Sequence, residues 1–520
     1  MKKKIKDFIA CFSLSSIIVL GPSFTQFANF NFFLNFEYLR LNIVLTILII
    51  LSVSYFFYLL KTKTLFSKNK FIKYSTYAVF LISFAFFLRA ILKVVVNNMK
   101  PFIFIFFTIT ALVLIVFSIV FFIKKPKMLL NFITTFLIIL FPFSSFLIYK
   151  ASVGFFSYKQ EKVQVFKNNK PKVIWIIFDE WDQFLSFEKR PNNVDLKEFD
   201  KLKQKAFSAS RAFQPGSNTI VSIPAYTTGK KIISSQVLGF NNLLLNFPDG
   251  KASFWHKESN IFSKLHSMEI NSAAAGLYPY EKLFNKYCTE KYSYFNKKNL
   301  FSYMPFVFYQ MIDFYFTAPL TKLTFQKVKL FKSLKSFFES SFCSNQYFGI
   351  KENAFKIMKN RDINFCFIHF SIPHPPGIYS KKDKKITKKI SSYSENLILM
   401  DKTLREIKLE LQKSNIWDES ILIFTSDHWL RKEFWDNTLS KLNKEEMDLC
   451  SQRKEALVPL IIKMPHQKEA ISYDKPFNAI SLHNLVLDIY NDKVSNEKDL
   501  VSWFDNLDDS LKKSYENITY

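Results

Sequence analysis

The sequence predicts two parts: an N-terminal transmembrane domain of five helices, and a following α/β domain with a mostly parallel central sheet. Residues 1–150 are dominated by Phe, Leu and Ile, whereas residues 171–495 alternate short apolar runs with amphipathic segments. Continuous apolar strands separated by helices are typical of a parallel sheet that helices cover on both faces. We expect a linker over residues 151–170 and a C-terminal tail over residues 496–520.

The apolar stretches of the N-terminal part are each close to the length that a helix needs to cross a bilayer, about 20 residues. Lysines are concentrated in three segments: before the first stretch, between the second and third, and between the fourth and fifth. This distribution predicts a cytoplasmic position for all three segments. An odd number of spans places everything after residue 150 outside. We therefore expect a multi-pass protein of the inner (cytoplasmic) membrane, with its second domain on the periplasmic or extracytoplasmic side. The five stretches lie near 8–27, 41–60, 74–96, 102–123 and 128–149.

A later stretch, residues 301–320, is also apolar and aromatic. A sixth span there would move the C-terminal third of the chain to the cytoplasm and separate groups that are argued below to meet. Asp313 also lies inside the stretch. We interpret it as an interfacial or core helix.

The net charge of +28 fits nucleic acid, anionic lipid or an anionic substrate as partner. Nucleic acid is not expected as a partner, because no recognition motif accompanies the charge and the chain is expected to lie in a membrane. The alternative is that lysine is used as a general surface residue. Six lysines between residues 381 and 389 could attract anionic headgroups or a glycan, although a solvated loop explains them more simply.

The chain has five cysteines, and none forms a CxxC pair, which excludes a zinc ribbon. Cys288 and Cys343 could pair in an oxidising compartment.

Predicted strands and helices alternate along the second domain. Ligands of such sheets bind beyond the carboxyl ends of the strands. The expected strands are 172–178, 208–213, 272–278, 364–370, 421–426 and 458–464, and the expected helices are 196–206, 220–227, 260–268, 392–413 and 481–491.

Acidic residues and a histidine follow two of these strands. Asp179 and Glu180 follow the first strand, and Asp427 and His428 follow strand 421–426. A carboxylate at the end of a buried strand is costly to leave unpaired, so a cation partner is expected. A helix N-cap or a structural ion pair is the alternative for each site alone. Carboxylates and imidazole together suit Zn²⁺ or Mn²⁺.

Thr219 follows a turn of small residues and opens a predicted helix. Helix N-terminal amides favour a bound anion, and a hydroxyl there could act as a nucleophile. The alternative is that Thr219 only caps the helix.

The order of these segments resembles the sulfatase-like branch of the alkaline-phosphatase superfamily. Sulfatases place their nucleophile nine residues before the Thr of a T-G pair, and counting back from Thr228 gives Thr219. The segments P-H-x-P at 373–376 and S-D-H at 426–428 resemble the parts of that family that contact the transferred group and the metal. Lipoteichoic acid synthases and lipid A phosphoethanolamine transferases are similarly built. The resemblance covers roughly residues 170–490.

The resemblance implies a site with one divalent metal ion (Zn, Mn, Mg or Ca). It makes Thr219 the nucleophile and His374 the residue that binds or protonates the transferred group. His369 is a weaker candidate for binding substrate, and Glu180 is a further candidate metal ligand. The implied ligands of the metal are Asp179, Thr219, Asp427 and His428.

Three departures from the family separate this chain from ordinary sulfatases. Val221 and Ile223 stand where the formylglycine motif has its proline and arginine, and threonine cannot become formylglycine. Sulfate-ester hydrolysis by that route is therefore not expected. Trp429 replaces the usual glycine after S-D-H, and the segment 238–345 matches no transferase signature, which leaves it free to select an acceptor.

Three functions follow from this reading. The preferred one is transfer of a phospholipid headgroup, phosphoethanolamine or phosphoglycerol, to an envelope glycan or lipid through an intermediate on Thr219. This function makes the phospholipid membrane and the envelope acceptor the expected partners. The second is a hydrolase of sulfuric or phosphoric esters with the same fold. The third is a non-catalytic membrane protein that retains the fold.

Overall fold

A computed structural model describes the chain in seven continuous stretches and a few isolated positions. The chain divides into two compact units: unit 1 comprises Met1–Asn31, Asn35–Tyr158 and Lys298–Val328, and unit 2 comprises Phe32–Leu34, Lys159–Lys297 and Lys329–Tyr520. The described stretches are 2–25, 36–66, 126–142, 161–238, 242–294, 329–436 and 442–513.

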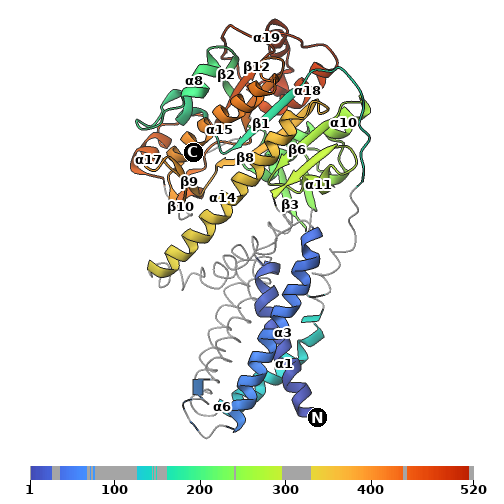
Figure 1. Cartoon of the computed structure of the whole chain (residues 1–520), viewed down its shortest axis with the longest axis vertical. Coiled ribbons are helices and arrows are strands. Elements are labelled where there is room, and N and C mark those ends of the chain that lie inside the picture. The colour runs from blue at the N-terminus through green and yellow to red at the C-terminus, as the bar shows by residue number, and fades with distance from the viewer. Residues whose placement is uncertain are drawn as a thin grey trace. The chain divides into compact units, whose positions relative to one another are not determined.

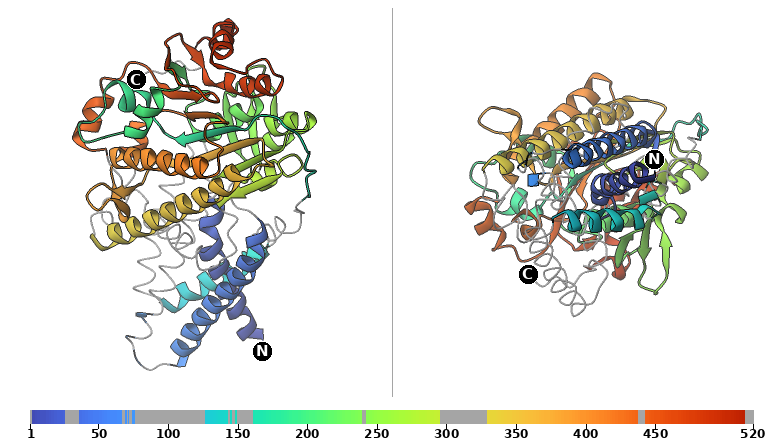
Figure 2. Two further views of the ribbon diagram at one scale, coloured as in Figure 1. Left: turned by 45° about the horizontal axis from the view of Figure 1, so that its top comes forward. Right: turned by 90° about the horizontal axis from the view of Figure 1, so that it is seen from below.

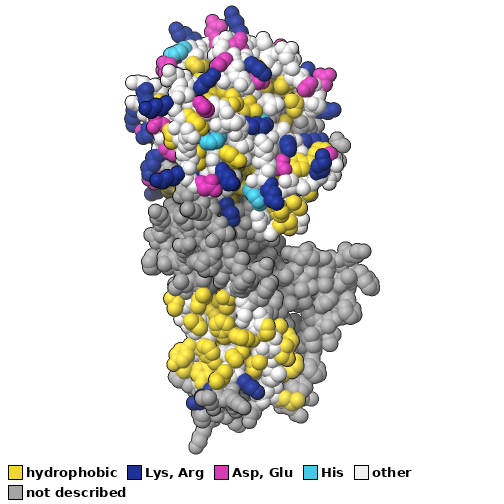
Figure 3. Space-filling view, turned by 90° about the vertical axis from the view of Figure 1, so that its right-hand side faces the viewer, with side chains coloured by type: hydrophobic (Ala, Val, Ile, Leu, Met, Phe, Trp, Pro, Cys, Tyr) yellow, Lys and Arg dark blue, Asp and Glu magenta, His cyan; other side chains and the backbone are white. Residues whose placement is uncertain are grey.

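Unit 1 contains three described helices, α1 (Lys2–Thr25), α3 (Phe36–Phe66) and α6 (Pro126–Ile139), and α1 packs against both of the others. A buried ammonium group joins them, because Lys61 Nζ lies 2.7 Å from Asp7 Oδ1 and 2.7 Å from Thr134 Oγ1. On the face drawn in Figure 3, hydrophobic side chains gather over the described part of this unit.

The predicted multi-pass membrane location is contradicted. Within the described stretches, no helix combines the length and the apolar character that a bilayer crossing requires. Helix α6 has 14 residues, or about 21 Å at 1.5 Å per residue, against a hydrocarbon core of about 30 Å. Helix α1 begins with a run of lysines. Apart from residues 74 and 75, the expected spans 74–96 and 102–123 lie outside the described residues, as does 301–320.

Unit 2 is built on one large sheet, and only strand β12 runs against the others among its described strands. The mostly parallel sheet that the sequence predicted is thus confirmed. The strand order is β13 (Ile471–Tyr473), β2 (Phe207–Phe213), β12 (Leu457–Lys463), β11 (Ile421–Ser426), β1 (Val173–Asp179), β8 (Phe365–Pro373), β6 (Ser272–Gly276) and β7 (Glu290–Ser293), and β14 (Phe477–Asn478) also pairs with β2.

Strand β1 lies in the middle of this sheet, and all seven of its residues are buried. It pairs in parallel with β11 and β8, and Phe178 lies opposite both Ser426 and Phe370. Parallel strands in this register end at the same edge. The residues that follow β1 and β11 therefore meet there.

Helices cover both faces of the sheet. On one face α14 (Lys329–Lys359) and α15 (Tyr393–Lys413) pack on β8 and lie side by side (Figures 1 and 2), with α8 (Lys197–Lys203) against α15. On the other face α9 (Thr219–Thr228), α10 (Ile261–Ser267) and α18 (Leu482–Tyr490) pack on one another over the main hydrophobic core, to which α19 (Glu497–Asp505) adds apolar residues. Capping boxes start α10 at Asn260 and α15 at Ser392, which fixes both helix starts.

Shorter elements complete unit 2. The lysines between 381 and 389 belong to a hairpin of β9 (Gly377–Ser380) and β10 (Lys385–Ser391), which begins three residues after His374. On the face drawn in Figure 3, acidic and basic side chains are interspersed over this unit. The remaining elements are η1 (Phe184–Glu188), β3 (Ser234–Val237), β4 (Leu243–Asn246), β5 (Ala252–Phe254), η2 (Trp255–Lys257), α11 (Tyr280–Leu283), α16 (Lys432–Asp436), α17 (Lys444–Cys450), η5 (Ala479–Ser481) and η6 (Asp509–Leu511).

The disulfide suggested for Cys288 and Cys343 is not formed. Cys288 is buried, and its Sγ donates to the backbone carbonyls of Ser272 and Glu290. Burial raises the pKa of this thiol to about 12, which keeps it protonated.

A buried histidine ties α18 to α9. His483 Nδ1 donates to the carbonyl of Tyr226 over 3.0 Å, and Lys264 Nζ donates to His483 Nε2 over 2.8 Å. Gly229 ends α9 with a φ of +69°, and a Cβ at this position would lie 2.6 Å from the His483 ring. His483 must therefore stay neutral to keep both hydrogen bonds.

We expect this histidine to make unit 2 less stable in acid. Burial lowers the pKa of His483 from 6.5 to about 4. Between these values the unfolded state binds more protons, so stability falls as pH drops from 6.5 toward 4. Because of this pKa difference, the free energy of unfolding should be about 2 kcal/mol lower at pH 5 than at pH 7. His483→Asn should weaken the pH dependence of urea unfolding by that amount. All tryptophans lie in unit 2, so tryptophan fluorescence reports its unfolding alone.

Candidate active site

Two buried carboxylates lie at the carboxyl ends of neighbouring strands. Asp179 is the last residue of β1, and Asp427 follows β11. Burial raises the pKa of Asp179 well above its usual range, and the nearby charges of Asp427 and Glu180 raise it further. Two such groups in one apolar site repel each other unless a cation lies between them.

The segment after β11 is fixed by hydrogen bonds to the end of β1. Ser426 Oγ donates to the carbonyl of Phe178 over 2.7 Å and accepts from the amide of Trp181 over 2.8 Å. Asp427 Oδ1 accepts from the amides of Glu180 and His428 over 3.1 and 2.9 Å. Its other oxygen, Oδ2, is buried and has no hydrogen-bond partner in the described part of the chain.

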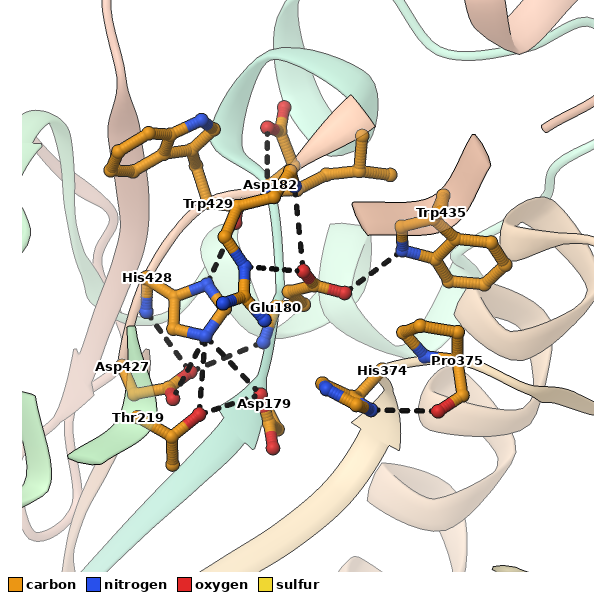
Figure 4. Close-up of polar contacts among 12 residues, drawn as sticks. Asp179, Glu180, Asp182, Thr219, His374, Pro375, Asp427, His428, Trp429 and Trp435 are labelled. Atoms are coloured by element: carbon orange, nitrogen blue, oxygen red, sulfur yellow. Dashed lines mark hydrogen bonds and ion pairs between the residues drawn. The ribbon is translucent and has the colours of Figure 1, made fainter. Parts of the chain in front are cut away.

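Thr219 is the first residue of α9, and the N-cap is Asn218. Its hydroxyl therefore does not cap the helix, the alternative that the sequence left open. Instead Thr219 Oγ1 lies 3.2 Å from His428 Nε2 and 3.5 Å from Asp179 Oδ1. Gly216 permits the tight turn before the helix, since a Cβ there would lie 2.5 Å from Val221 Cγ1. Figure 4 shows Asp179, Thr219, Asp427 and His428 converging.

His428 directs a nitrogen lone pair into this cluster. Its Nδ1 lies 2.8 Å from the carbonyl of Trp429, which can only accept, so Nδ1 carries the proton. Burial and the charge of Arg431 lower the pKa of His428 to about 3, which keeps the ring neutral. Nε2 is then unprotonated, 3.3 Å from Asp427 Oδ2 and 3.6 Å from Asp179 Oδ1.

His369, which the sequence suggested only as a weaker substrate contact, belongs to the same cluster. It lies in β8, is fully buried, and its Nε2 is 3.8 Å from Asp179 Oδ2. Neither ring nitrogen has a hydrogen-bond partner among the described residues. Burial lowers the pKa of His369 to about 4, so the ring stays neutral. The ring of Tyr278 stacks on it at 6.1 Å.

These groups fit a divalent metal. Ligand atoms of Asp179, His369 and Asp427 lie within 4.8 Å of one another, and all three residues are buried. The unpartnered Asp427 Oδ2 and His369 nitrogens are costly in an apolar site and would be satisfied by a cation. Mixed carboxylate and imidazole ligands suit Zn²⁺ or Mn²⁺ better than Mg²⁺ or Ca²⁺.

Glu180, the further ligand candidate, is engaged elsewhere. Its Oε1 accepts from Arg431 Nε over 2.9 Å, and its Oε2 accepts from Trp435 Nε1 over 2.8 Å (Figure 4). Its backbone has a positive φ of 67°, a conformation that non-glycine residues rarely adopt. The structure thus turns this carboxylate towards the segment after β11, away from Asp179.

His374 lies at the rim of the site. Its amide donates to the carbonyl of Asp179 over 3.0 Å, which fixes its backbone beside the cluster. The ring donates from Nδ1 to the Pro375 carbonyl over 2.7 Å. Burial lowers the pKa of His374, so the ring is neutral and Nε2 can accept a proton.

Arg431 and Trp435, which bind Glu180, were not predicted from the sequence. Tyr278 and Tyr280 were not predicted either. Their phenol pKa values are raised by burial and, among smaller causes, by the charges of Asp179 and Asp427. The only signal for the arginine was its position three residues after His428. Nothing in the sequence indicated the tyrosines.

The family model described as Sulfatase matches residues 171–491 of the chain. The chain belongs to the sulfatase family. It is therefore an enzyme, as the sequence predicted. A search among curated proteins gave no significant match.

Solved structures that are similar to this sulfatase-family chain match it at low identity and with TM-scores below 0.5. The structure of Ps i-CgsB has 15% identity and a TM-score of 0.42, over 64% of this chain and 74% of its own. The phosphonate monoester hydrolase of Agrobacterium radiobacter has 14% identity and a TM-score of 0.37, over 62% and 74%. Murine ectonucleotide pyrophosphatase/phosphodiesterase 5 has 12% identity and a TM-score of 0.36, over 62% and 95%.

Proposed function

We propose that this sulfatase-family enzyme transfers a phosphorylated group through a covalent intermediate on Thr219. The observation that carries the proposal is the placement of a partly exposed Thr219 hydroxyl 3.2 Å from the unprotonated Nε2 of His428, beside the buried carboxylates. Asp179, Asp427, His428 and His369 would hold one divalent metal, Zn²⁺ or Mn²⁺. When bound, that ion would supply Lewis-acid stabilisation of negative charge.

In the first step, Thr219 Oγ1 forms a bond to phosphorus as the bond from phosphorus to the leaving alcohol oxygen breaks. Since His428 Nε2 would bind the metal, Asp179 Oδ1, 3.5 Å from Thr219 Oγ1, is the acceptor within reach of the hydroxyl proton. The proton released by Thr219 ends on the leaving alcohol, so charge and atoms balance. The amides at the start of α9 favour the anionic group at this position.

In the second step, the hydroxyl oxygen of an acceptor bonds to phosphorus as the bond from phosphorus to Thr219 Oγ1 breaks, and the proton that a base takes from the acceptor ends on Thr219. His374 suits the role of base here, because its Nδ1 proton is committed to Pro375 and its Nε2 is free to accept. This assignment sharpens the sequence expectation, in which His374 binds or protonates the transferred group.

The proposed donor is a phospholipid headgroup, phosphoethanolamine or phosphoglycerol, and the proposed acceptor is an envelope glycan or lipid. Hydrolysis with water as acceptor is the second candidate. The formylglycine route to sulfate hydrolysis is disfavoured, because Ile223 is fully buried in the hydrophobic core, where the arginine of that motif would be an unpaired charge.

Peptide mass spectrometry on the full chain tests the proposal. After incubation with Mn²⁺ and detergent-dispersed phosphatidylethanolamine and phosphatidylglycerol, we expect one headgroup added to the peptide that carries Thr219. Thr219→Ala should abolish the adduct. Ser222→Ala is the matched control, because it removes the other early hydroxyl of α9, which donates to the Gly216 carbonyl instead.

The outcomes separate the candidates. An adduct that decays without any added acceptor, with free headgroup released into the water, would favour the hydrolase. An adduct on another residue, or none after rapid acid quenching with metal bound, would remove Thr219 as the nucleophile.

A further inference from the structure

Arg431 lies at the active site without belonging to any motif of the sequence. It follows Leu430 in the segment after β11 and precedes α16, and its side chain is partly exposed. Nε donates to Glu180 Oε1 over 2.9 Å, and the backbone amide donates to the same oxygen over 3.4 Å. The guanidinium carbon also lies 4.7 Å from the centre of the Phe434 ring. The contacts with Glu180 and Phe434 therefore hold the guanidinium in one orientation.

The anchor on Glu180 is itself rigid. Glu180 is fully buried, and its second oxygen accepts from the buried indole of Trp435. Its backbone amide donates to Asp427, and its carbonyl accepts from the Tyr393 hydroxyl over 2.9 Å. The orientation of Arg431 is thus set by the same residue that positions Asp427.

This arrangement uses only one edge of the guanidinium. The ion pair engages Nε, and neither terminal nitrogen of Arg431 has an acceptor in the described part of the chain. Up to four N–H donors therefore remain for a ligand. A guanidinium presents these donors in a planar fork that matches the oxygens of phosphate or sulfate.

The charge of Arg431 acts on three groups of the site. It lowers the pKa of Asp179, after the larger raising effects of burial and of the Asp427 and Glu180 charges. It also lowers the pKa values of His428 and His374, for which burial is the larger cause. The ring of His374 lies 5.4 Å from Phe434, which packs under the guanidinium. Arg431 and His374 therefore both contact Phe434.

We propose that Arg431 binds the non-reacting oxygens of the phosphoryl group at the active site through its terminal nitrogens, with Glu180 as its positioning residue. The proposal rests on the proposed function for the identity of the anion. In this proposal, a residue outside the metal cluster binds part of the negative charge of the substrate. A guanidinium fixed before the reaction stabilises developing charge without reorganising.

The variants must separate anion binding from folding. Arg431→Met alone would leave the buried Glu180 carboxylate unpaired and could unfold the chain. The double variant Glu180→Gln/Arg431→Met removes both charges and keeps an amide oxygen for Trp435. Glu180→Gln alone keeps the guanidinium. Lys432→Met is the matched control, because it removes a neighbouring positive charge that is not bonded to Glu180.

The test is calorimetric titration of the full chain, loaded with Mn²⁺, with inorganic phosphate. We expect phosphate affinity to fall about 100-fold in Glu180→Gln/Arg431→Met, about tenfold in Arg431→Lys, and less than threefold in Lys432→Met. Bound Mn²⁺ should be equal in all of them. Wild-type phosphate affinity in the double variant, or no phosphate binding by the Mn²⁺-loaded wild type, would overturn the proposal.

The readout is independent of the nucleophile. If phosphate affinity depends on Arg431 but no adduct forms on Thr219, the covalent mechanism fails and the anion site stands. If the adduct forms at the wild-type rate in the double variant, the anion site fails and the covalent mechanism stands.

Discussion

Replacing Asp427 with asparagine should weaken binding of Mn²⁺ or Zn²⁺ about 1,000-fold and abolish metal-dependent turnover. Asparagine can keep the amide contacts that Oδ1 receives from Glu180 and His428. Its NH₂ group, however, would replace the buried, unpartnered Oδ2 and point donors at the position of the cation. Loss of a residue that hydrogen-bonds to a metal ligand lowers metal affinity about 10- to 100-fold. Loss of a direct ligand should lower it more, by about 4 kcal/mol of binding free energy.

The same variant should fold well without metal. Removing the Asp427 charge relieves repulsion with Asp179, so metal-free Asp427→Asn should unfold at the same or higher temperature than metal-free wild type. Adding Mn²⁺ should raise the midpoint of wild type and not of the variant. Asp401→Asn is the control, since Asp401 is also buried but accepts amides at the start of α8, outside the site. Equal Mn²⁺ affinity in equilibrium dialysis of Asp427→Asn and wild type would exclude Asp427 as a ligand.

Much of unit 2 was predictable because its strands are short, continuous apolar runs. Strand 421–426 was placed to the residue, and the predicted 172–178 and 364–370 are β1 and β8. Such runs can only be buried, which fixes both their existence and their place in the centre of the sheet. The hairpin of β9 and β10 was missed, since its run of lysines lacks the apolar alternation of a half-buried strand.

Site residues could be predicted from the sequence only where a polar side chain lies at or directly after the end of a strand. Asp179 and Asp427 could be placed together because parallel neighbouring strands end at one edge. The role of Glu180 could not be read this way, since it depends on a left-handed backbone that turns the side chain towards Arg431 and Trp435. His369 was undervalued because its two unpartnered nitrogens become visible only when the burial of β8 is known.

For the N-terminal part, the location predicted from apolar composition is wrong. Apolar composition predicted spans, but the described helices of unit 1 bury Asp7 and Lys61 as an ion pair inside their own packing. Hydropathy alone does not specify whether an apolar face meets lipid or another helix.

Breaking the buried ion pair of Arg453 and Asp182 should be the most destabilising single change in unit 2. Asp182 is fully buried, and Arg453 Nη1 contacts its Oδ2. Asp182 also accepts from the amides of Leu185 and Leu430, and Arg453 donates to the Leu430 carbonyl over 3.1 Å. Arg453→Met would leave a buried carboxylate without its cation, which costs about 3–5 kcal/mol.

A comparison with a surface pair tests the reason for this loss. Arg190 binds both oxygens of Asp200, at 2.9 and 2.8 Å, but the pair is partly exposed, so Arg190→Met should cost about 1 kcal/mol or less. Urea unfolding followed by tryptophan fluorescence measures both variants. Asp182→Asn/Arg453→Met should recover part of the loss, since no buried charge remains. Because the pair holds Leu430 between His428 and Arg431, the single variant should also lower Mn²⁺ affinity, whereas Arg190→Met should not. Equal losses for the two single variants would mean that Asp182 is hydrated in solution and that burial does not set the strength of this contact.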